Sequence, residues 1–339
     1  MASDPAHDAA YRASVVALQA KTEHPAVLPG VQPAATVRAY HHLGLACRDP
    51  AASSAFYQRL GFKPLGGDAG AARGAGIVRL GHVPNGLELH LLQADDKSGS
   101  DNVLMDRPTE KFPGHTHASW AVPSVPALES FLAGLGVELS GTRSTLAVFV
   151  RDPDRTTLEF ERNDGKDEPP ASFGAEHVGA GKPLDHVGTR LRAPFERHLE
   201  WYARNLGFNS LLRQYEPNPD PLKNGPPWIT RTPAGCDINW IINANTEIPA
   251  AGEAAENVLV LGGVVKPGIL YAAFSIEESD AAATLARLQA NGADARLDTQ
   301  LAGWCDLPPD AVQLTEGAPT IMLRDLNGNF VRLVPSPAS

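Results

Sequence analysis

Three histidines and a glutamate in the first half of the sequence lie in segments that alternate polar with apolar residues. They are His42, His90, His117 and Glu159. Successive side chains of a β-strand point to opposite faces, and the apolar face of each segment is the one that can pack beneath a helix. The polar residues share the other face, so strands that curl around it would bring imidazoles and a carboxylate together. Such a set without thiolates is typical of a catalytic site for Fe, Mn, Co, Ni or Zn.

These segments belong to an internal repeat. YHHLGLACRDPAASSAFYQRLGF at 40–62 matches LDHVGTRLRAPFERHLEWYARNLGF at 184–208, and each contains a short strand pattern with a histidine followed by a helix pattern that ends in Leu-Gly-Phe. Two later pairs of blocks match in the same order. Asp49 can cap the first helix and Pro50 suits its first position. The chain is therefore predicted to contain two copies of one design.

Each copy divides into two strand-helix-strand-strand-strand units, so the predicted fold class is α+β, with four βαβββ modules and curved mixed sheets. We predict two domains of two modules each, at 38–163 and 184–337. A polar linker that contains Gly and Pro joins them at 164–183. Residues 1–37 are predicted to form an N-terminal extension with the spacing of one amphipathic helix. The candidate metal ligands all fall in the first domain.

The composition excludes several classes of function. The 339 residues are 43% hydrophobic and 20% charged, which suits two globular domains rather than a disordered chain. The net charge of −10 disfavours nucleic acid and anionic membranes as partners. No secretory signal or run of about 18 apolar residues is seen, so we predict a cytoplasmic protein. Three cysteines lie too far apart for a CxxC or zinc-ribbon motif.

The order and spacing of the motifs resemble the vicinal oxygen chelate superfamily, which includes glyoxalase I, extradiol dioxygenases and bleomycin resistance proteins. The resemblance covers nearly the whole chain after residue 37, and its most specific local match is to glyoxalase-I-like proteins. It is carried by HHLGLACRD, FYQRLGF, LHLLQADD, GHTHASWAV and VRDPDRTTLEFE. It implies a two-domain member with modules paired into vicinal-oxygen-chelate domains, and metal ligands on the first and fourth strands of the modules.

The resemblance assigns a metal to four positions of this sequence. The first-strand ligands fall on His42 and His117, and the last-strand ligand falls on Glu159. The fourth position falls on His90 or, if the register slips by two residues, on Glu88. Because these two side chains share a face, one can bind the metal while the other acts as a base. We favour His90 as the ligand.

The second half departs from the pattern. Its first-strand place holds His186, but the remaining matched places hold Asn239 or Asp237, Tyr271 and Arg332. A guanidinium has no lone pair to offer a metal. We therefore predict that the second domain is metal-free.

Several other sequence features are predicted to have no role in the site. His41 and His115 lie within two residues of predicted ligands without occupying a motif position, and we predict that neither binds the metal. The glycine-rich stretch 66–76 lacks the spacing of a phosphate-binding loop. The proline-rich stretch 213–228 is predicted to be a surface loop.

These residues lead to three functional hypotheses. The first is a lyase or isomerase in which one divalent metal ion per chain, held by His42, His90, His117 and Glu159, chelates a small substrate through neighbouring oxygens, while Glu88 or a displaced Glu159 moves a proton. The alternative is an Fe(II)-dependent, extradiol-type dioxygenase that uses three of these ligands and keeps positions open for substrate and dioxygen. The last is a non-catalytic, metal-free binding protein of the resistance type. Each hypothesis implies a small-molecule partner and either a monomer or a homodimer.

Overall fold

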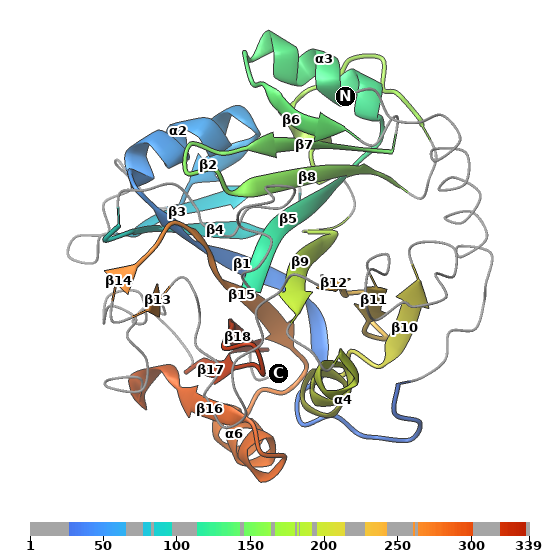
Figure 1. The fold of residues 1–339 in the computed structure, drawn as a ribbon, viewed down its shortest axis with the longest axis vertical. Coiled ribbons are helices and arrows are strands. Elements are labelled where there is room, and N and C mark those ends of the chain that lie inside the picture. The colour runs from blue at the N-terminus through green and yellow to red at the C-terminus, as the bar shows by residue number, and fades with distance from the viewer. Residues whose placement is uncertain are drawn as a thin grey trace.

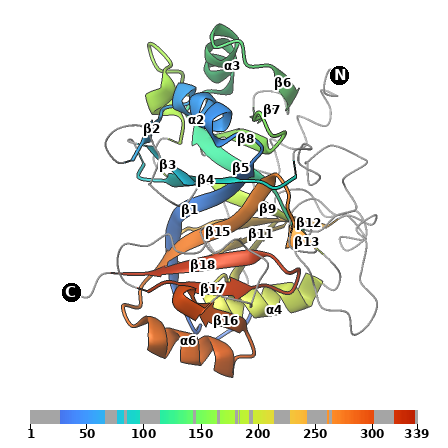
Figure 2. The same ribbon diagram turned by 90° about the vertical axis from the view of Figure 1, so that its left-hand side faces the viewer.

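Two eight-stranded mixed sheets form the centre of the computed structural model, with helices at both ends of the molecule (Figures 1 and 2). None of the helices in the described part of the chain has the length and hydrophobicity of a membrane span. The structure describes residues 27–65, 77–82, 85–96, 114–142, 146–163, 167–179, 182, 184–191, 195–213, 228–242, 260–261, 264–300 and 319–336.

The first sheet, here the β1 sheet, has the strand order β16-β17-β18-β15-β1-β4-β3-β2. Its strands come from the first and the fourth module of the chain. They are β1 (Val37–Cys47), β2 (Phe62–Pro64), β3 (Ile77–His82), β4 (Glu88–Gln93), β15 (Gly268–Ile276), β16 (Asp294–Leu297), β17 (Ile321–Arg324) and β18 (Phe330–Pro335).

The second sheet, here the β5 sheet, has the order β10-β11-β12-β9-β5-β8-β7-β6 and is built from the middle of the chain. A small ribbon of β13 (Val260–Leu261) and β14 (Val264–Val265) stands apart from it. The strands of the β5 sheet are β5 (Gly114–Val122), β6 (Leu139–Thr142), β7 (Ala147–Arg151), β8 (Thr157–Arg162), β9 (His186–Leu191), β10 (Ser210–Arg213), β11 (Trp228–Arg231) and β12 (Asp237–Ile242).

Each quarter of the chain contributes one helix between its first and second strands. Helices α2 and α3 lie at one end of the molecule, and α4 and α6 lie at the other (Figures 1 and 2). Their bounds are α2 (Pro50–Arg59), α3 (Val125–Gly134), α4 (Phe195–Leu206) and α6 (Ala281–Ala290), with short 3-10 turns η3 (Ala175–His177) and η4 (Asp298–Gln300). The predicted α+β fold with duplicated βαβββ modules is confirmed.

The modules pair differently from the expected arrangement. The two modules of each half were predicted to pair into one domain, but β1 pairs antiparallel with β15 and β5 pairs antiparallel with β9. The first module therefore joins the fourth, and the second joins the third. All four first strands offer the same backbone donors and acceptors, so the local pattern does not select among them. The boundaries predicted for the two domains stay a prediction.

The start of α2 follows the local sequence signals. A carboxylate oxygen of Asp49 accepts hydrogen bonds from the backbone nitrogens of Ala51 and Ala52, and Pro50 occupies the first turn. These bonds satisfy backbone donors that have no partner inside the helix. Gly61 follows the helix with a φ of 98°, a conformation that side chains with a Cβ rarely adopt. The predicted cap of this helix is confirmed.

A buried tyrosine–aspartate pair connects the two modules of each half. The Tyr57 hydroxyl on α2 donates to Asp152 in the β7–β8 turn over 2.9 Å. The Tyr202 hydroxyl on α4 donates to Asp325 in the β17–β18 turn, also over 2.9 Å. All four side chains are buried. Modules adjacent in sequence thus contact each other through helix and turn, while their strands pair across the halves.

The described part of the N-terminal extension packs against α4. The backbone nitrogens of Ala34 and Ala35 donate to the carbonyl oxygens of Arg204 and Asn205. These carbonyls lie in the last turn of α4, where a helix lacks internal partners. The amphipathic helix predicted earlier in the extension falls in residues 1–26, outside the described residues, as do the predicted loop at 66–76 and residues 214–227 of the loop predicted at 213–228.

Candidate metal centre

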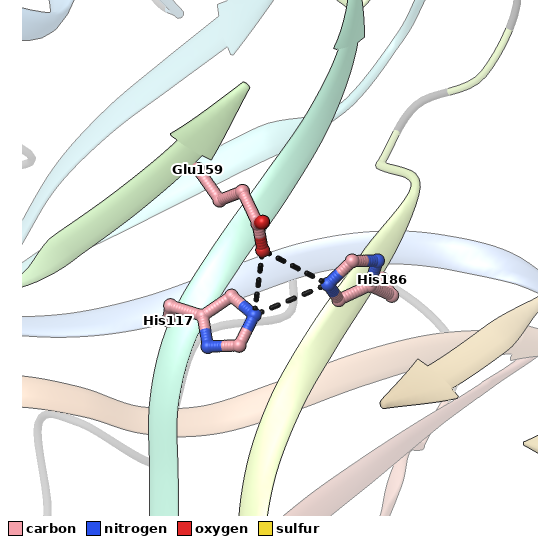
Figure 3. Close-up of side chains that lie close together, drawn as sticks. All are labelled: His117, Glu159 and His186. Atoms are coloured by element: carbon pink, nitrogen blue, oxygen red, sulfur yellow. Dashed lines mark hydrogen bonds and ion pairs between the residues drawn. The ribbon is translucent and has the colours of Figure 1, made fainter. Parts of the chain in front are cut away.

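Three donor atoms from three neighbouring strands face one another in the β5 sheet (Figure 3). The Nε2 atom of His117 on β5 lies 3.0 Å from Oε2 of Glu159 on β8 and 3.1 Å from Nε2 of His186 on β9. The Oε2 atom of Glu159 and Nε2 of His186 are 3.4 Å apart. Every one of these side chains is at most 2% exposed.

Strand register brings these residues to one place. Ser119 of β5 lies opposite Glu159 of the parallel strand β8 and opposite His186 of the antiparallel strand β9. His117 is two residues before Ser119 and therefore lies on the same face of β5. The centre consequently depends on β5 having these two strands as its neighbours.

A glycine makes room for the His117 ring. Gly188 of β9 lies directly opposite His117, and a Cβ atom built on it would come within 1.8 Å of the imidazole Cε1 atom. The ring therefore occupies the space that a side chain at this position would fill. Any other residue at this position would move the ring away from its partners.

Hydrogen bonds at the far nitrogens orient both imidazoles. The Thr116 hydroxyl donates to the carbonyl oxygen of Gly188, so its oxygen accepts from Nδ1 of His117, which is 3.0 Å away. The Nδ1 atom of His186 lies 2.9 Å from a carboxylate oxygen of Asp185, which can accept its proton. With Nδ1 bound to these acceptors, Nε2 of each ring faces the shared centre and is the nitrogen that can bind a metal.

The surroundings favour positive charge at this point. Burial lowers the pKa of His186, but its hydrogen bonds to Asp185 and Glu159, and the nearby Glu161 carboxylate, raise it to about 10. A buried imidazole with a raised pKa shows that the surrounding carboxylates stabilise a cation more than burial penalises it. A divalent ion gains from the same field.

The triangle of donors fits an ion of transition-metal size. A metal about 2.1 Å from each donor would separate neighbouring ligands by about 3.0 Å in octahedral geometry and about 3.4 Å in tetrahedral geometry. The three separations of 3.0, 3.1 and 3.4 Å lie in that range. His117, Glu159 and His186 therefore form a candidate two-histidine, one-carboxylate metal centre.

The four predicted ligands are not brought together. His117 and Glu159 lie in the centre, whereas His42 on β1 and His90 on β4 lie in the β1 sheet. The expectation of a single site failed because β5 pairs with β9 of the second half rather than with β1. His186 supplies the third donor, so the second half contributes to the centre although it was expected to be metal-free. The sequence feature that could have identified His186 is its place in the repeat, which matches that of His42.

His42 and His90 form a separate polar cluster. Their rings stack with centroids 4.0 Å apart. Burial lowers the pKa of His42 well below its ordinary value and lowers that of His90 to about 4. Tyr271 lies in the same cluster, with its hydroxyl 3.4 Å from Nδ1 of His90. These imidazoles are neutral at pH 7.

Glu88 also belongs to this second cluster. Its carboxylate lies 3.0 Å from Nε2 of His90 and 2.8 Å from the guanidinium of Arg79. Burial raises the pKa of Glu88, but hydrogen bonds from these two partners outweigh burial and bring it to about 2. A carboxylate with so low a pKa is a weak base, and it lies in the other sheet from the candidate centre. The role of a proton-moving base does not fit it.

The two histidines left out of the predicted ligand set lie outside the donor triangle. His41 contacts its neighbour His42, with their Nδ1 atoms 2.8 Å apart. The Nδ1 atom of His115 lies 2.9 Å from the Thr189 hydroxyl, and burial lowers the pKa of His115 to about 4.

Comparison with known families gives the class of the first half of the chain. Residues 39–170 match the model of the Glyoxalase/Bleomycin resistance protein/Dioxygenase superfamily. This part of the chain belongs to that superfamily, and the strands of the second half repeat its fold. No curated protein matches the sequence.

Solved structures share the architecture at low sequence identity. A Bacillus subtilis protein provisionally named a dioxygenase is 12% identical, with a TM-score of 0.55 over 90% of this chain and 87% of its own. A glyoxalase I variant from Zea mays is 14% identical, with a TM-score of 0.53 over 88% of this chain and 93% of its own. At such identities the likeness shows the fold alone.

Proposed function

We propose that the protein is a divalent-metal-dependent enzyme whose ion is held by His117, Glu159 and His186. The supporting observation is the triangle of donor atoms at 3.0–3.4 Å, buried and surrounded by carboxylates. Its substrate would be a small molecule that chelates the ion through two neighbouring oxygens, as the superfamily implies.

Within that class, the ligand set favours Fe(II)-dependent oxygenation. Two histidines and one carboxylate with open positions are the facial set of non-haem iron oxygenases. The fourth matched strand position holds Asn239, whose amide nitrogen lies 3.4 Å from Nε2 of His186. A neutral amide is a weaker ligand for a transition metal than an imidazole or a carboxylate. When bound, Fe(II) supplies a place where a substrate with vicinal oxygens and dioxygen meet.

The chain's own residues would hold the ion and shield it from bulk water. His117 and His186 offer neutral nitrogens, and Glu159 adds one negative charge, so the protein leaves one positive charge of a divalent ion for an anionic substrate oxygen. Their burial keeps bulk water from competing for these groups. Thr116 and Asp185 keep both rings in the orientation that binding requires.

A lyase or isomerase is the second candidate, because of the position of Glu159. Both imidazoles contact the same oxygen, Oε2, which leaves Oε1 outside the donor triangle. A carboxylate in this position can bind the ion with one oxygen and move a proton at an adjacent substrate carbon with the other. This reaction needs no dioxygen and accepts Zn, Ni, Co or Mn.

Metal analysis tests the proposal and separates the candidates. The protein is purified anaerobically without chelators, beside His117→Ala and the matched control His42→Ala, and its metals are measured by mass spectrometry. About one iron per chain, absent from His117→Ala and kept in His42→Ala, with oxygen consumption on catechol-like substrates, supports the dioxygenase. About one zinc, nickel, cobalt or manganese with anaerobic turnover of 2-oxo compounds supports the lyase.

The absence of metal would contradict the proposal. If neither wild type nor variants retain any metal after reconstitution, both enzyme proposals fail. The remaining interpretation is then a binding protein of the resistance type.

A further inference from the structure

A row of alternating charges leads from the surface to His186. The Nδ1 atom of His186 lies 2.9 Å from Oδ2 of Asp185, and Nζ of Lys182 lies 2.9 Å from Oδ1 of the same carboxylate. Lys182 is also 3.6 Å from Asp237, which Arg231 holds with bonds of 2.6 and 2.7 Å. Each oxygen of Asp185 thus has its own partner.

We propose that Asp185 is the positioning residue that makes His186 a metal ligand. An ionised carboxylate can only accept hydrogen bonds, so Nδ1 of His186 keeps its proton and Nε2 is the nitrogen that gives up its proton when a metal binds. The negative charge also increases the electron density at Nε2, and such partners of metal-ligating histidines strengthen metal binding. This inference rests on the metal centre of the proposed function.

The duplicated copy of the same strand shows what happens without the carboxylate. In the repeat His41 takes the place of Asp185, and its Nδ1 atom lies 2.8 Å from Nδ1 of His42. An imidazole nitrogen can donate or accept, so His41 leaves the tautomer of His42 undetermined. The residue before the first-strand histidine is therefore one of the differences between the two copies, beside those at the places of His117 and Glu159.

Lys182 supports Asp185 less strongly than Asp185 supports His186. The Lys182 side chain is 40% exposed, so water screens its charge. Its bond to Oδ1 still limits rotation of the carboxylate and keeps Oδ2 directed at the imidazole. Removal of Lys182 should therefore weaken metal binding by only a few fold.

Titration with Co²⁺ alone tests the inference. Visible absorption of Co²⁺ gives the affinity of the full-length protein, and His117→Ala identifies the signal of this centre. Asp185→Ala should weaken binding by about 10–100-fold, the usual effect of losing such a partner. Asp185→Asn, whose amide oxygen can still accept from Nδ1, should weaken it less. The matched control is His41→Ala, which should leave the affinity unchanged.

A proton signal distinguishes positioning from a general structural effect. Two histidines bound through Nε2 should give two exchangeable, hyperfine-shifted Nδ1–H resonances in the Co²⁺ protein. Asp185→Ala should shift one of them or broaden it through faster exchange with water, whereas a general structural effect would disturb both.

The possible failures are distinguishable. If wild type binds no Co²⁺, the metal centre and the proposed function fail together. If wild type binds Co²⁺ and Asp185→Ala binds it equally well with both resonances unchanged, the role of Asp185 is wrong and the metal centre stands. An equal loss in His41→Ala would also contradict the inference.

Discussion

The candidate metal centre of the β5 sheet and the matched places of the β1 sheet, here called the duplicate, have the same backbone arrangement but differ in charge. In the centre, His117 lies over Gly188 of the neighbouring first strand; in the duplicate, Tyr271 lies over Gly44. A Cβ at Gly188 would come within 1.8 Å of the histidine ring, and one at Gly44 within 2.1 Å of the tyrosine ring. The two places are therefore built in the same way around different side chains.

The side chains at the other matched places reverse the charge. Ser119 lies opposite Glu159, whereas the matched Ala273 lies opposite Arg332, which is fully buried. Burial and the neighbouring His90 and Arg332 lower the pKa of His42. The comparison teaches that duplication preserved the geometry, and that a few substitutions decided which copy can attract a cation.

Removal of a donor should have the largest effect and should be confined to one copy. His117→Ala should weaken metal affinity by more than about 100-fold, because changes to indirect partners alone cost about 10–100-fold. Turnover should fall on the order of 10³-fold, corresponding to loss of several kcal/mol of Lewis-acid stabilisation. His42→Ala should retain metal and turnover. Equal losses in both variants, measured by metal content and steady-state kinetics, would break the comparison.

Stability should fall as the pH rises because of the buried Tyr57–Asp152 pair in the first half. Burial and then the neighbouring Asp154 raise the pKa of Asp152 to about 7 from its usual 3.8, although hydrogen bonds from Tyr57 and two backbone amides oppose the rise. The folded protein therefore holds this proton more tightly than the unfolded chain. The stability this provides is complete below about pH 4 and is lost as pH rises to about 7, a change on the order of 4 kcal/mol.

Asp152→Asn should flatten this part of the pH profile, measured by urea unfolding between pH 4 and 8. The matched variant in the second half is Asp325→Asn. There burial also raises the carboxyl pKa, but Asn327 takes the place of Asp154, so no second acid adds to it. A larger flattening in Asp325→Asn than in Asp152→Asn would contradict this account.

The glycines should separate stability from metal binding. Gly188→Ala and Gly44→Ala each force an aromatic ring to move, which should cost about 1–3 kcal/mol of unfolding free energy. Only Gly188→Ala should also weaken metal affinity, because it displaces His117. Urea unfolding and Co²⁺ titration of both variants provide the measurements. If Gly44→Ala loses metal as well, the two copies are coupled.

Restoring the charges of the duplicate should have the smallest effect. A variant with His41→Asp, Tyr271→His and Arg332→Glu carries the donor types of the metal centre in the β1 sheet. We expect a second, weaker equivalent of Co²⁺ by calorimetry, with circular dichroism as the check on folding. A folded variant that still binds one equivalent would show that these three residues do not explain the difference.

Much of the local structure was readable in the sequence. The Asp49 cap and the helix end at Gly61 depend only on neighbouring residues, and the alternation of the strands placed His117 and Glu159 on one face. The fold class followed from the repeated order of these elements. The role of Asp185 left no signal beyond its place beside His186, because a single carboxylate before a histidine has many structural explanations.

The partner of each first strand was decided only by the tertiary structure. The side-chain pattern of β1, β5, β9 and β15 is similar, and their backbone groups are identical, so local sequence does not select among the possible pairs. Pairing of β5 with β9 brought His186 to His117 and left His42 in the other sheet. The sequence by itself determined the modules and singled out two of the three residues of the candidate centre. The third depended on long-range strand pairing, whose free energy comes from packing over the whole sheet rather than from any one segment.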